Sequence, residues 1–186
     1  MKKRYLFIIF ILVVKCFSSA CQVYKSPVQN IEENRLRNAV RIHPVHELAY
    51  VRLAQYLEIQ GRYNETFSVL RVGQQRITEA IALVRLEGAL FQRLGLYNDA
   101  YKFYSEQITR HSKEALLYLD RAKLSWRMKK KQLALADALK VITLQPDLFE
   151  AHFLIGVIYS METGPNVSDQ SEKALDSFIR ASEIND

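Results

Sequence analysis

The chain repeats itself with a period of 34 residues. The segment GRYNET at 61–66 returns as GLYNDA at 95–100, and 95 − 61 = 34. Three such steps carry Pro44 onto Pro146, because 146 − 44 = 102 = 3 × 34. A fixed period of this length indicates a repeat architecture, in which each unit is too small to bury its own apolar face and must stack on its neighbours. The repetition therefore restricts the possible folds more than any other feature of the sequence.

The period divides residues 30–186 into a half-repeat and four units. The half-repeat covers 30–44, the regular units cover 47–80, 81–114 and 115–148, and a longer unit covers 149–186. In the half-repeat, Leu36 and Ala39 lie at packing positions of a helical pattern, so we expect one helix that caps the amino end of the stack. The longer unit has about six extra residues between Thr163 and Lys173, and their polar composition predicts a loop.

The four units resemble the tetratricopeptide repeat (TPR) family, and the resemblance covers about residues 31 to 186. A small residue falls early in the first helix of each unit, namely Ala54, Gly88, Ala122 and Gly156. Another small residue opens the second helix, and four residues after it stands its packing partner. These pairs are Thr66 with Leu70, Ala100 with Tyr104, Ala134 with Ala138 and Ala174 with Phe178. Gly61 and Gly95 stand where a helix end needs a left-handed residue, whereas Lys129 stands at that place in the third unit. The resemblance implies an all-α, right-handed superhelical solenoid of antiparallel helix pairs.

Two groups of charged residues depart from the family pattern. Glu87 and Arg121 occupy equivalent places, 34 residues apart, where the family usually has leucine. They either pair across the repeat boundary or both reach the surface, and we favour pairing. A basic run follows at the end of the third unit's first helix, formed by Arg127, Lys129, Lys130 and Lys131. We interpret it as offsetting the helix dipole, with contact to an acidic partner or to lipid headgroups as the alternative.

Residues 1–20 are predicted to be a signal peptide. Three basic residues at 2–4 precede an apolar run at 5–14, which Lys15 ends. As a helix this run reaches only ~15 Å, about half the thickness of a bilayer's hydrocarbon core. A basic head, a short apolar middle and small residues at 18–20 are typical of a cleaved secretory signal, although an uncleaved anchor is the alternative.

Cys21 is predicted to carry a lipid. The sequence SSAC at 18–21 resembles a bacterial lipobox, from which it departs by having Ser18 where the strict pattern has leucine. Residues 21–29 would then be the lipidated cysteine and a tether, and the protein would be exported and anchored to the bacterial envelope, facing the periplasm, with the outer membrane favoured. Cys16 and Cys21 are the only cysteines, so the exported domain would have no disulfide. Ordinary cleavage, giving a secreted soluble protein, is the alternative.

Charge and motifs argue against an enzyme or a nucleic-acid-binding protein. The formal net charge of +6 falls to 6 − 4 = +2 once residues 1–20 are removed, which weakens the case for nucleic acid. We find no phosphate-binding loop, no nucleophile elbow and no cysteine nucleophile beyond residue 21. The four histidines, His43, His46, His111 and His152, lack the spacing of a metal site and are interpreted as structural. We predict no cofactor and no metal.

What remains is a binding surface. Family geometry implies that certain first-helix positions line the concave face of the superhelix. The predicted partner-binding residues are Val51, Gln55, Arg85, Gln92, Leu119, Lys123, Trp126, Arg127, Phe153 and Val157. The same pattern also places Leu48, Glu58, Ala82, Ala89, Arg93, Leu116 and Met161 there. Trp126 is the only tryptophan, a residue type that often dominates the binding energy of interfaces.

The last predicted helix has apolar residues over more than half of its circumference. Phe178 and Ala181 should face the fourth unit's first helix, which leaves Leu175 and Ile179 for a second copy or a partner's helix, and a homodimer through this helix is possible. We therefore predict a non-catalytic adaptor that binds a peptide or helix of an envelope protein in its concave groove. A secreted, unlipidated binding module and a self-assembling structural component are the alternatives.

Overall fold

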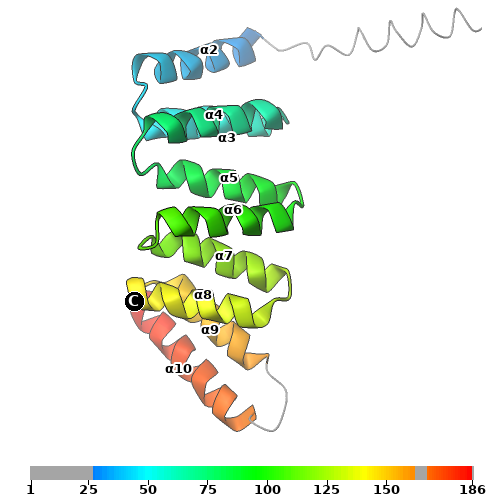
Figure 1. The fold of residues 1–186 in the computed structure, drawn as a ribbon, viewed down its shortest axis with the longest axis vertical. Coiled ribbons are helices and arrows are strands. Elements are labelled where there is room, and N and C mark those ends of the chain that lie inside the picture. Colours follow the sequence, from blue (N-terminus) through cyan, green and yellow to red (C-terminus); the bar gives the residue numbers. More distant parts are fainter. Residues whose placement is uncertain (1–26, 162–166, 186) are drawn as a thin grey trace, which may run out of the picture.

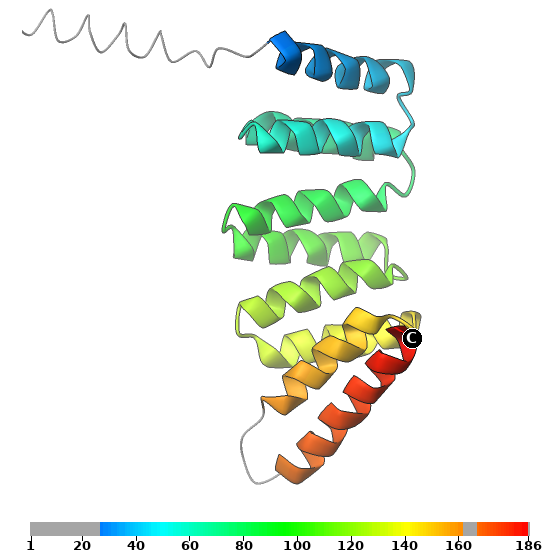
Figure 2. The same ribbon diagram turned by 180° about the vertical axis from the view of Figure 1, so that it is seen from behind.

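The computed structural model describes residues 27–161 and 167–185. These residues form nine helices and no strand: α2 (Pro27–Ile42), α3 (Glu47–Ile59), α4 (Tyr63–Arg76), α5 (Ile81–Arg93), α6 (Tyr97–Arg110), α7 (Ala115–Arg127), α8 (Lys131–Leu144), α9 (Phe149–Ser160) and α10 (Val167–Asn185). The helices are stacked along one long axis, with α2 at one end and α10 at the other (Figures 1 and 2). The predicted all-α helical-repeat solenoid is confirmed.

The amino-terminal predictions fall mostly outside the described residues. The signal peptide at 1–20, Cys21 and the residues up to 26 are among those that the structure does not describe. The predicted tether at 21–29 overlaps α2, which begins at Pro27. Proline suits the first turn of a helix, because an N–H at that position has no partner within the helix. Of the helices in the described ranges, none has the length and apolar character needed to cross a membrane.

Each full repeat is a pair of helices joined by a short turn. α3 packs on α4, α5 on α6, α7 on α8 and α9 on α10, while each second helix also packs on the first helix of the next repeat. The first helices α3, α5, α7 and α9 additionally contact one another in order, and α2 packs on α3 as a second helix would. This layout buries four apolar clusters between the helices and puts the first helices on one continuous face.

Where the two helices of a pair cross, a small residue on the first helix lies against a larger side chain or an alanine on the second helix. A methyl group added at Gly88 would lie 2.3 Å from Cζ of Tyr104, and one added at Gly156 would lie 2.7 Å from Cε1 of Phe178. Where the crossing residue is alanine, its partner is smaller, namely leucine at 70 opposite Ala54 and alanine at 138 opposite Ala122. Glycine therefore occurs where an aromatic ring crosses the helix backbone.

We predict that Gly88→Ala lowers the free energy of unfolding by about 1–3 kcal/mol, because the added methyl overlaps the buried Tyr104 ring. Tyr104→Leu in the same chain recreates the Ala54–Leu70 combination and should reduce the cost of the alanine. Urea unfolding of both single variants and the double variant measures this coupling. Strictly additive losses would show that the ring is not what excludes the methyl group.

Three repeats end their first helix with the same left-handed turn. Gly61 has a φ of 70° and Gly95 a φ of 75°, as the sequence predicts, and Lys129 adopts a φ of 60° at the equivalent place. In the third repeat the amide of Lys130 donates to the carbonyl of Ser125 at 2.9 Å, the bond that closes this type of helix end. Lys129 therefore holds a conformation that favours glycine.

Lys129→Gly is expected to raise the free energy of unfolding by about 1 kcal/mol, because a left-handed residue with a Cβ costs about 1–2 kcal/mol and glycine avoids that cost. Lys130→Gly is the matched control, since Lys130 has a φ of −90° and gains nothing from glycine. The free energies of unfolding of the two variants, measured by chemical denaturation, should change in opposite directions. Equal changes would mean that the turn of the third repeat is unstrained.

The predicted pairing of Glu87 with Arg121 is wrong. Glu87 is 1% exposed and accepts hydrogen bonds from Arg71 Nε and Gln74 Nε2 of α4, each at 2.8 Å. Arg121 instead donates to both carboxylate oxygens of Asp137 on α8, at 2.8 and 2.7 Å. Both side chains project toward neighbouring second helices, where each finds a partner. A buried charge needs such compensation, and here the second helices supply it.

The predicted loop in the fourth unit is shorter than expected. Residues 162–166 lie outside the described ranges, but α10 begins at Val167 and is 19 residues long, against 14 for α4, α6 and α8. Residues from 167 onward are therefore helical, and the insertion lengthens the last helix.

The half-repeat is fastened to the first full repeat by four charged residues. Arg62 donates to Glu33 of α2 at 2.8 Å and also bonds Glu65, while Arg37 of α2 donates to Glu65 at 2.9 Å. Hydrogen bonding to Arg62 lowers the pKa of Glu65 below its ordinary value. The contribution of this carboxylate to the free energy of unfolding is therefore fully present above the pKa that it has in the unfolded chain. It is lost as the pH falls through the pKa that it has in the folded protein. The cluster fixes α2 at one end of the stack.

Candidate functional site

The face formed by the first helices contains a depression of about 350 Å³. Its lining comes from α3, α5, α6 and α7, and consists of Val51, Ala82, Arg85, Leu86, Ala89, Gln92, Tyr104 and Asp120. Three of the predicted partner-binding residues, Val51, Arg85 and Gln92, are thus brought together from two repeats. We call this depression the groove pocket.

The polar groups of the groove pocket are held in place. Arg85 donates from Nε and one terminal nitrogen to the two oxygens of Asp120, at 2.7 and 3.1 Å, and this hydrogen bonding raises the pKa of Arg85. Gln92 Nε2 donates to the hydroxyl of Tyr104 at 3.2 Å. Burial raises the pKa of Tyr104, and the charge of Asp120 adds to the effect. The pocket therefore presents apolar walls with fixed donors and acceptors, and these two shifted groups keep their protons at neutral pH.

Contacts between successive first helices run beside the groove pocket. Arg93 forms a bidentate ion pair with Glu58, in which Nε donates to Oε1 and Nη2 donates to Oε2 at 2.7 Å. A carboxylate oxygen of Glu47 accepts the backbone amide of Ala82 at 3.0 Å. Like Arg85 and Asp120, the members of each contact are 35 residues apart. The sequence analysis missed the roles of Glu47 and Asp120, but opposite charges at this spacing could have revealed two of the three contacts.

The other predicted binding residues lie outside the groove pocket. Gln55, Lys123, Arg127 and Phe153 are exposed, and Val157 is partly buried. Phe153 stacks on Phe149 with 5.8 Å between ring centroids and meets Phe178 edge-on at 5.7 Å. The guanidinium carbon of Arg127 lies 5.8 Å from the ring centroid of Tyr97, a cation–π distance. These residues remain predicted contacts, separate from the groove pocket.

The prediction for Leu119 is wrong. Its side chain is 1% exposed and belongs to a buried cluster with Ala115, Val141 and Ala151. Residues of α8 and α9 cover it. Val51 of α3 and Arg85 of α5 hold the equivalent position in their own repeats, where their side chains are only partly buried. Leu119 is therefore a core residue and cannot contact a partner.

Trp126 is half-buried and packs against the cluster that contains Ala122 and Leu154. We predict that Trp126→Ala lowers the free energy of unfolding by about 2 kcal/mol, less than the 3–5 kcal/mol of a fully buried tryptophan. Arg127→Ala, at the exposed neighbouring position, should change it by less than about 0.5 kcal/mol. Equal stability of the two variants would instead place the indole on the open face.

Residues 27–161 and 167–185 contain no group of three or more His, Cys, Asp or Glu side chains that could hold a metal ion. Nε2 of His152 lies 2.7 Å from the carbonyl oxygen of Pro146, a contact that packs the start of α9 on the preceding turn. His43 and His46 line a second depression, between α2 and α3.

Together, the paired helices, the repeated left-handed turns and the face of first helices define a solenoid of the TPR type. Solved structures share this fold. A crystal structure of MamA matches with a TM-score of 0.60 and 16% identity, over 82% of this chain and 86% of that one. Residues 41 to the end of MamA from Desulfovibrio magneticus RS-1 match with a TM-score of 0.59 and 15% identity, over 93% of each chain.

A third solved structure is that of YrrB, described as a TPR protein with an unusual peptide-binding site. It matches with a TM-score of 0.55 and 15% identity, over 84% of this chain and 77% of that one. No protein-family model and no curated protein sequence matches the chain. The likeness to these structures is one of fold.

Proposed function

We propose that the chain is a non-catalytic protein–protein interaction module, which binds a peptide or helix of another protein on the face of first helices. The observation that carries the proposal is the groove pocket, where Val51, Arg85 and Gln92 converge from two repeats. The peptide-binding site of YrrB, a protein with the same fold, supports it. Two titratable groups of the groove pocket, Arg85 and Tyr104, have pKa values raised further from neutrality, which makes these two poorly suited to acid–base catalysis.

The chemistry of the groove pocket suits one apolar side chain and the polar backbone beside it. Ala82, Ala89 and Val51 supply short apolar walls around a space of about 350 Å³. Gln92 has a side-chain carbonyl in addition to the amide that bonds Tyr104, and Asp120 is already engaged by Arg85. A partner segment would be selected chiefly by shape and apolar contact, with a few hydrogen bonds that fix its orientation.

Ala89→Lys should weaken partner binding at least about tenfold, because the lysine fills the pocket and places a charge against apolar walls. Ala136→Lys is the matched control, since this exposed alanine lies on α8, outside the pocket. Peptides selected from a random library on the wild-type protein provide the ligands, and titration calorimetry provides the affinities. Equal binding by both lysine variants would show that the peptide-binding site lies outside the groove pocket.

We further propose that the protein is anchored to the bacterial envelope by a lipid on Cys21, after removal of residues 1–20, and that its partner is an envelope protein. The support is the sequence SSAC at 18–21 behind a short apolar run. A secreted, unlipidated product is the alternative.

Cys21→Ser should release the protein from the membrane fraction, because the acylated thiol is then missing. Intact mass of the membrane-extracted wild type should show the acyl chains and the loss of residues 1–20. Ser18→Leu, which moves the site toward the strict lipobox, should leave the protein in the membrane fraction. A soluble wild-type product that begins at an unmodified Cys21 would rule out the anchor.

A second candidate function, self-assembly, is favoured by the last helix. Leu175 is 59% exposed and Ile179 is 47% exposed, whereas Ala181 on the opposite side of α10 is buried. Two neighbouring aliphatic side chains on an open helix face form a surface that another helix can cover.

A further inference from the structure

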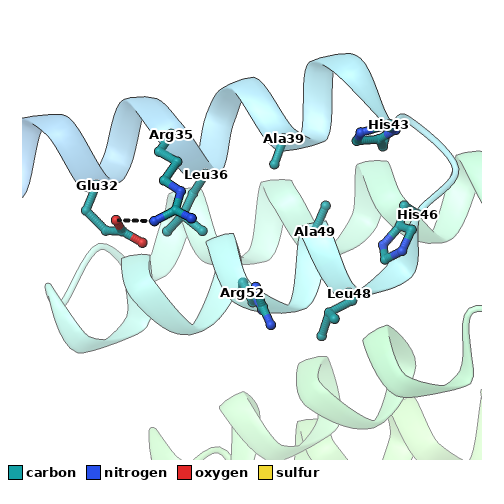
Figure 3. Close-up of a pocket in the computed structure, with 9 residues that line it drawn as sticks. All are labelled: Glu32, Arg35, Leu36, Ala39, His43, His46, Leu48, Ala49 and Arg52. Atoms are coloured by element: carbon teal, nitrogen blue, oxygen red, sulfur yellow. Dashed lines mark ion pairs between the residues drawn. The ribbon is translucent and has the colours of Figure 1, made fainter.

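A second depression lies at the α2 end of the stack, between α2 and α3 (Figure 3). It has a volume of about 470 Å³ and is lined by Glu32, Arg35, Leu36, Ala39, His43, His46, Leu48, Ala49 and Arg52. Leu36 and Ala39 of α2 point toward α3, and Ala49 of α3 points back toward α2 (Figure 3). We call this depression the end slot.

Residues equivalent to those of the end slot are covered by a first helix elsewhere in the stack. Thirty-four residues after Leu36 and Ala39 stand Leu70 and Gly73, which are buried where α4 packs on α3. Leu36 and Ala39 themselves are only partly buried, and Leu48 beside them is 46% exposed. Within residues 27–161 and 167–185 no helix occupies this place. The end slot is therefore shaped to receive one helix against α2 and α3.

The rim of the end slot is basic. Arg35 and Arg52 are both exposed, and the one carboxylate of the lining, Glu32, lies 3.9 Å from Arg35. Figure 3 shows Arg35 directed toward Glu32 from the same side of α2. A helix that enters the slot should present an apolar stripe with acidic residues along one edge.

Helix α10 presents such a face at the other end of the stack. Leu175 and Ile179 form the apolar stripe, and Glu172, Asp176 and Glu183 are exposed beside it. Successive residues of a helix are turned by about 100° around its axis. Measured around that axis, all three carboxylates lie on the same side of Leu175 as Ile179 and within about 100° of it. Glu183 bonds Arg180 at 3.2 Å. The stripe is therefore edged by three carboxylates, which we call the acidic row and of which Glu183 is paired with Arg180.

The two surfaces also agree in length. From Glu32 to His43 the slot runs 43 − 32 = 11 residues, along α2 and the residue that follows it, and the acidic row runs 183 − 172 = 11 residues along α10. Each corresponds to about 16 Å of helix. The two surfaces lie at opposite ends of the long axis (Figures 1 and 2), so one chain cannot join them to each other.

We propose that α10 of one copy docks in the end slot of a second copy, with Leu175 and Ile179 against Leu36, Ala39 and Leu48, and the acidic row beside Arg35 and Arg52. The contact joins two different surfaces, so it is head-to-tail and repeats into a ring or a filament. This gives the self-assembly considered above a defined acceptor, and it does not depend on the groove pocket.

Two blocking variants test the arrangement in the protein purified as the producing cell processes it. Leu48→Glu blocks the end slot and Ile179→Glu blocks α10, and both sites are about half exposed, so the fold should tolerate them. Sedimentation velocity at micromolar concentration should show concentration-dependent assembly of the wild type. Each variant alone should stay monomeric, whereas their equimolar mixture should form a 1:1 dimer and nothing larger, because one intact slot meets one intact α10.

A charge exchange gives an independent test. Arg52→Glu and Asp176→Arg should each weaken assembly about tenfold or more, and the double variant should recover it, because opposite charges again meet between copies. Leu133→Glu, at a similarly exposed leucine of α8, is the control that should assemble normally. Ala89→Lys should also assemble normally, which separates a failure of this proposal from a failure of the groove pocket.

Three results would overturn the proposal. A wild type that stays monomeric would show that α10 does not enter the slot, leaving it to the chain's own residues 1–26 or to another protein. Assembly that Ile179→Glu abolishes but Leu48→Glu spares would indicate a symmetric contact between two α10 helices. A mixture of the two blocked variants that stays monomeric would show that the slot and α10 do not meet.

Discussion

The stack depends on how closely the two helices of each repeat can cross. A side chain one methyl group too large at Gly88 would collide with the ring of Tyr104, a residue 1% exposed in the centre of its cluster. Interiors are packed too densely to absorb such a change without moving a helix. In a solenoid, a moved helix displaces every later repeat, because each repeat is positioned only by its neighbours. Local size matching at four crossings thus sets the geometry of the whole surface.

The same crossing builds the groove pocket. The Tyr104 ring passes over the backbone of α5 at Gly88, and its hydroxyl ends beside the side chain of Gln92 on the groove. A packing residue of the second helix therefore contributes a polar group to the face of the first helices. Arg85 and Asp120 then join the second and third repeats across this face. The polar side chains of the groove pocket are consequently held by contacts to each other and to a core residue, which lowers the entropic cost of binding a segment there.

Much of this fold is contained in the 34-residue period, because the period fixes which residues are equivalent and glycine at 61 and 95 fixes the turns. Equivalence does not fix partners, however. Glu87 and Arg121 are equivalent, yet each is paired by whichever second-helix residue happens to lie opposite, Arg71 in one case and Asp137 in the other. Leu119 is equivalent to Arg85, yet the start of α9 covers it. Burial at such positions depends on the neighbouring repeat, which the repeat's own sequence does not contain.

The ends of the stack follow from the same dependence on neighbours. Inside the stack, the wall formed by a second helix and the next first helix is always covered, whereas the wall of α2 and α3 is covered by no helix of the described residues. The outer stripe of α10 is open for the same reason. Because the end slot and α10 lie apart from the groove pocket, occupation of one surface leaves the other accessible. A head-to-tail array would then display one groove pocket per copy, and a partner with several binding segments would gain affinity from simultaneous engagement.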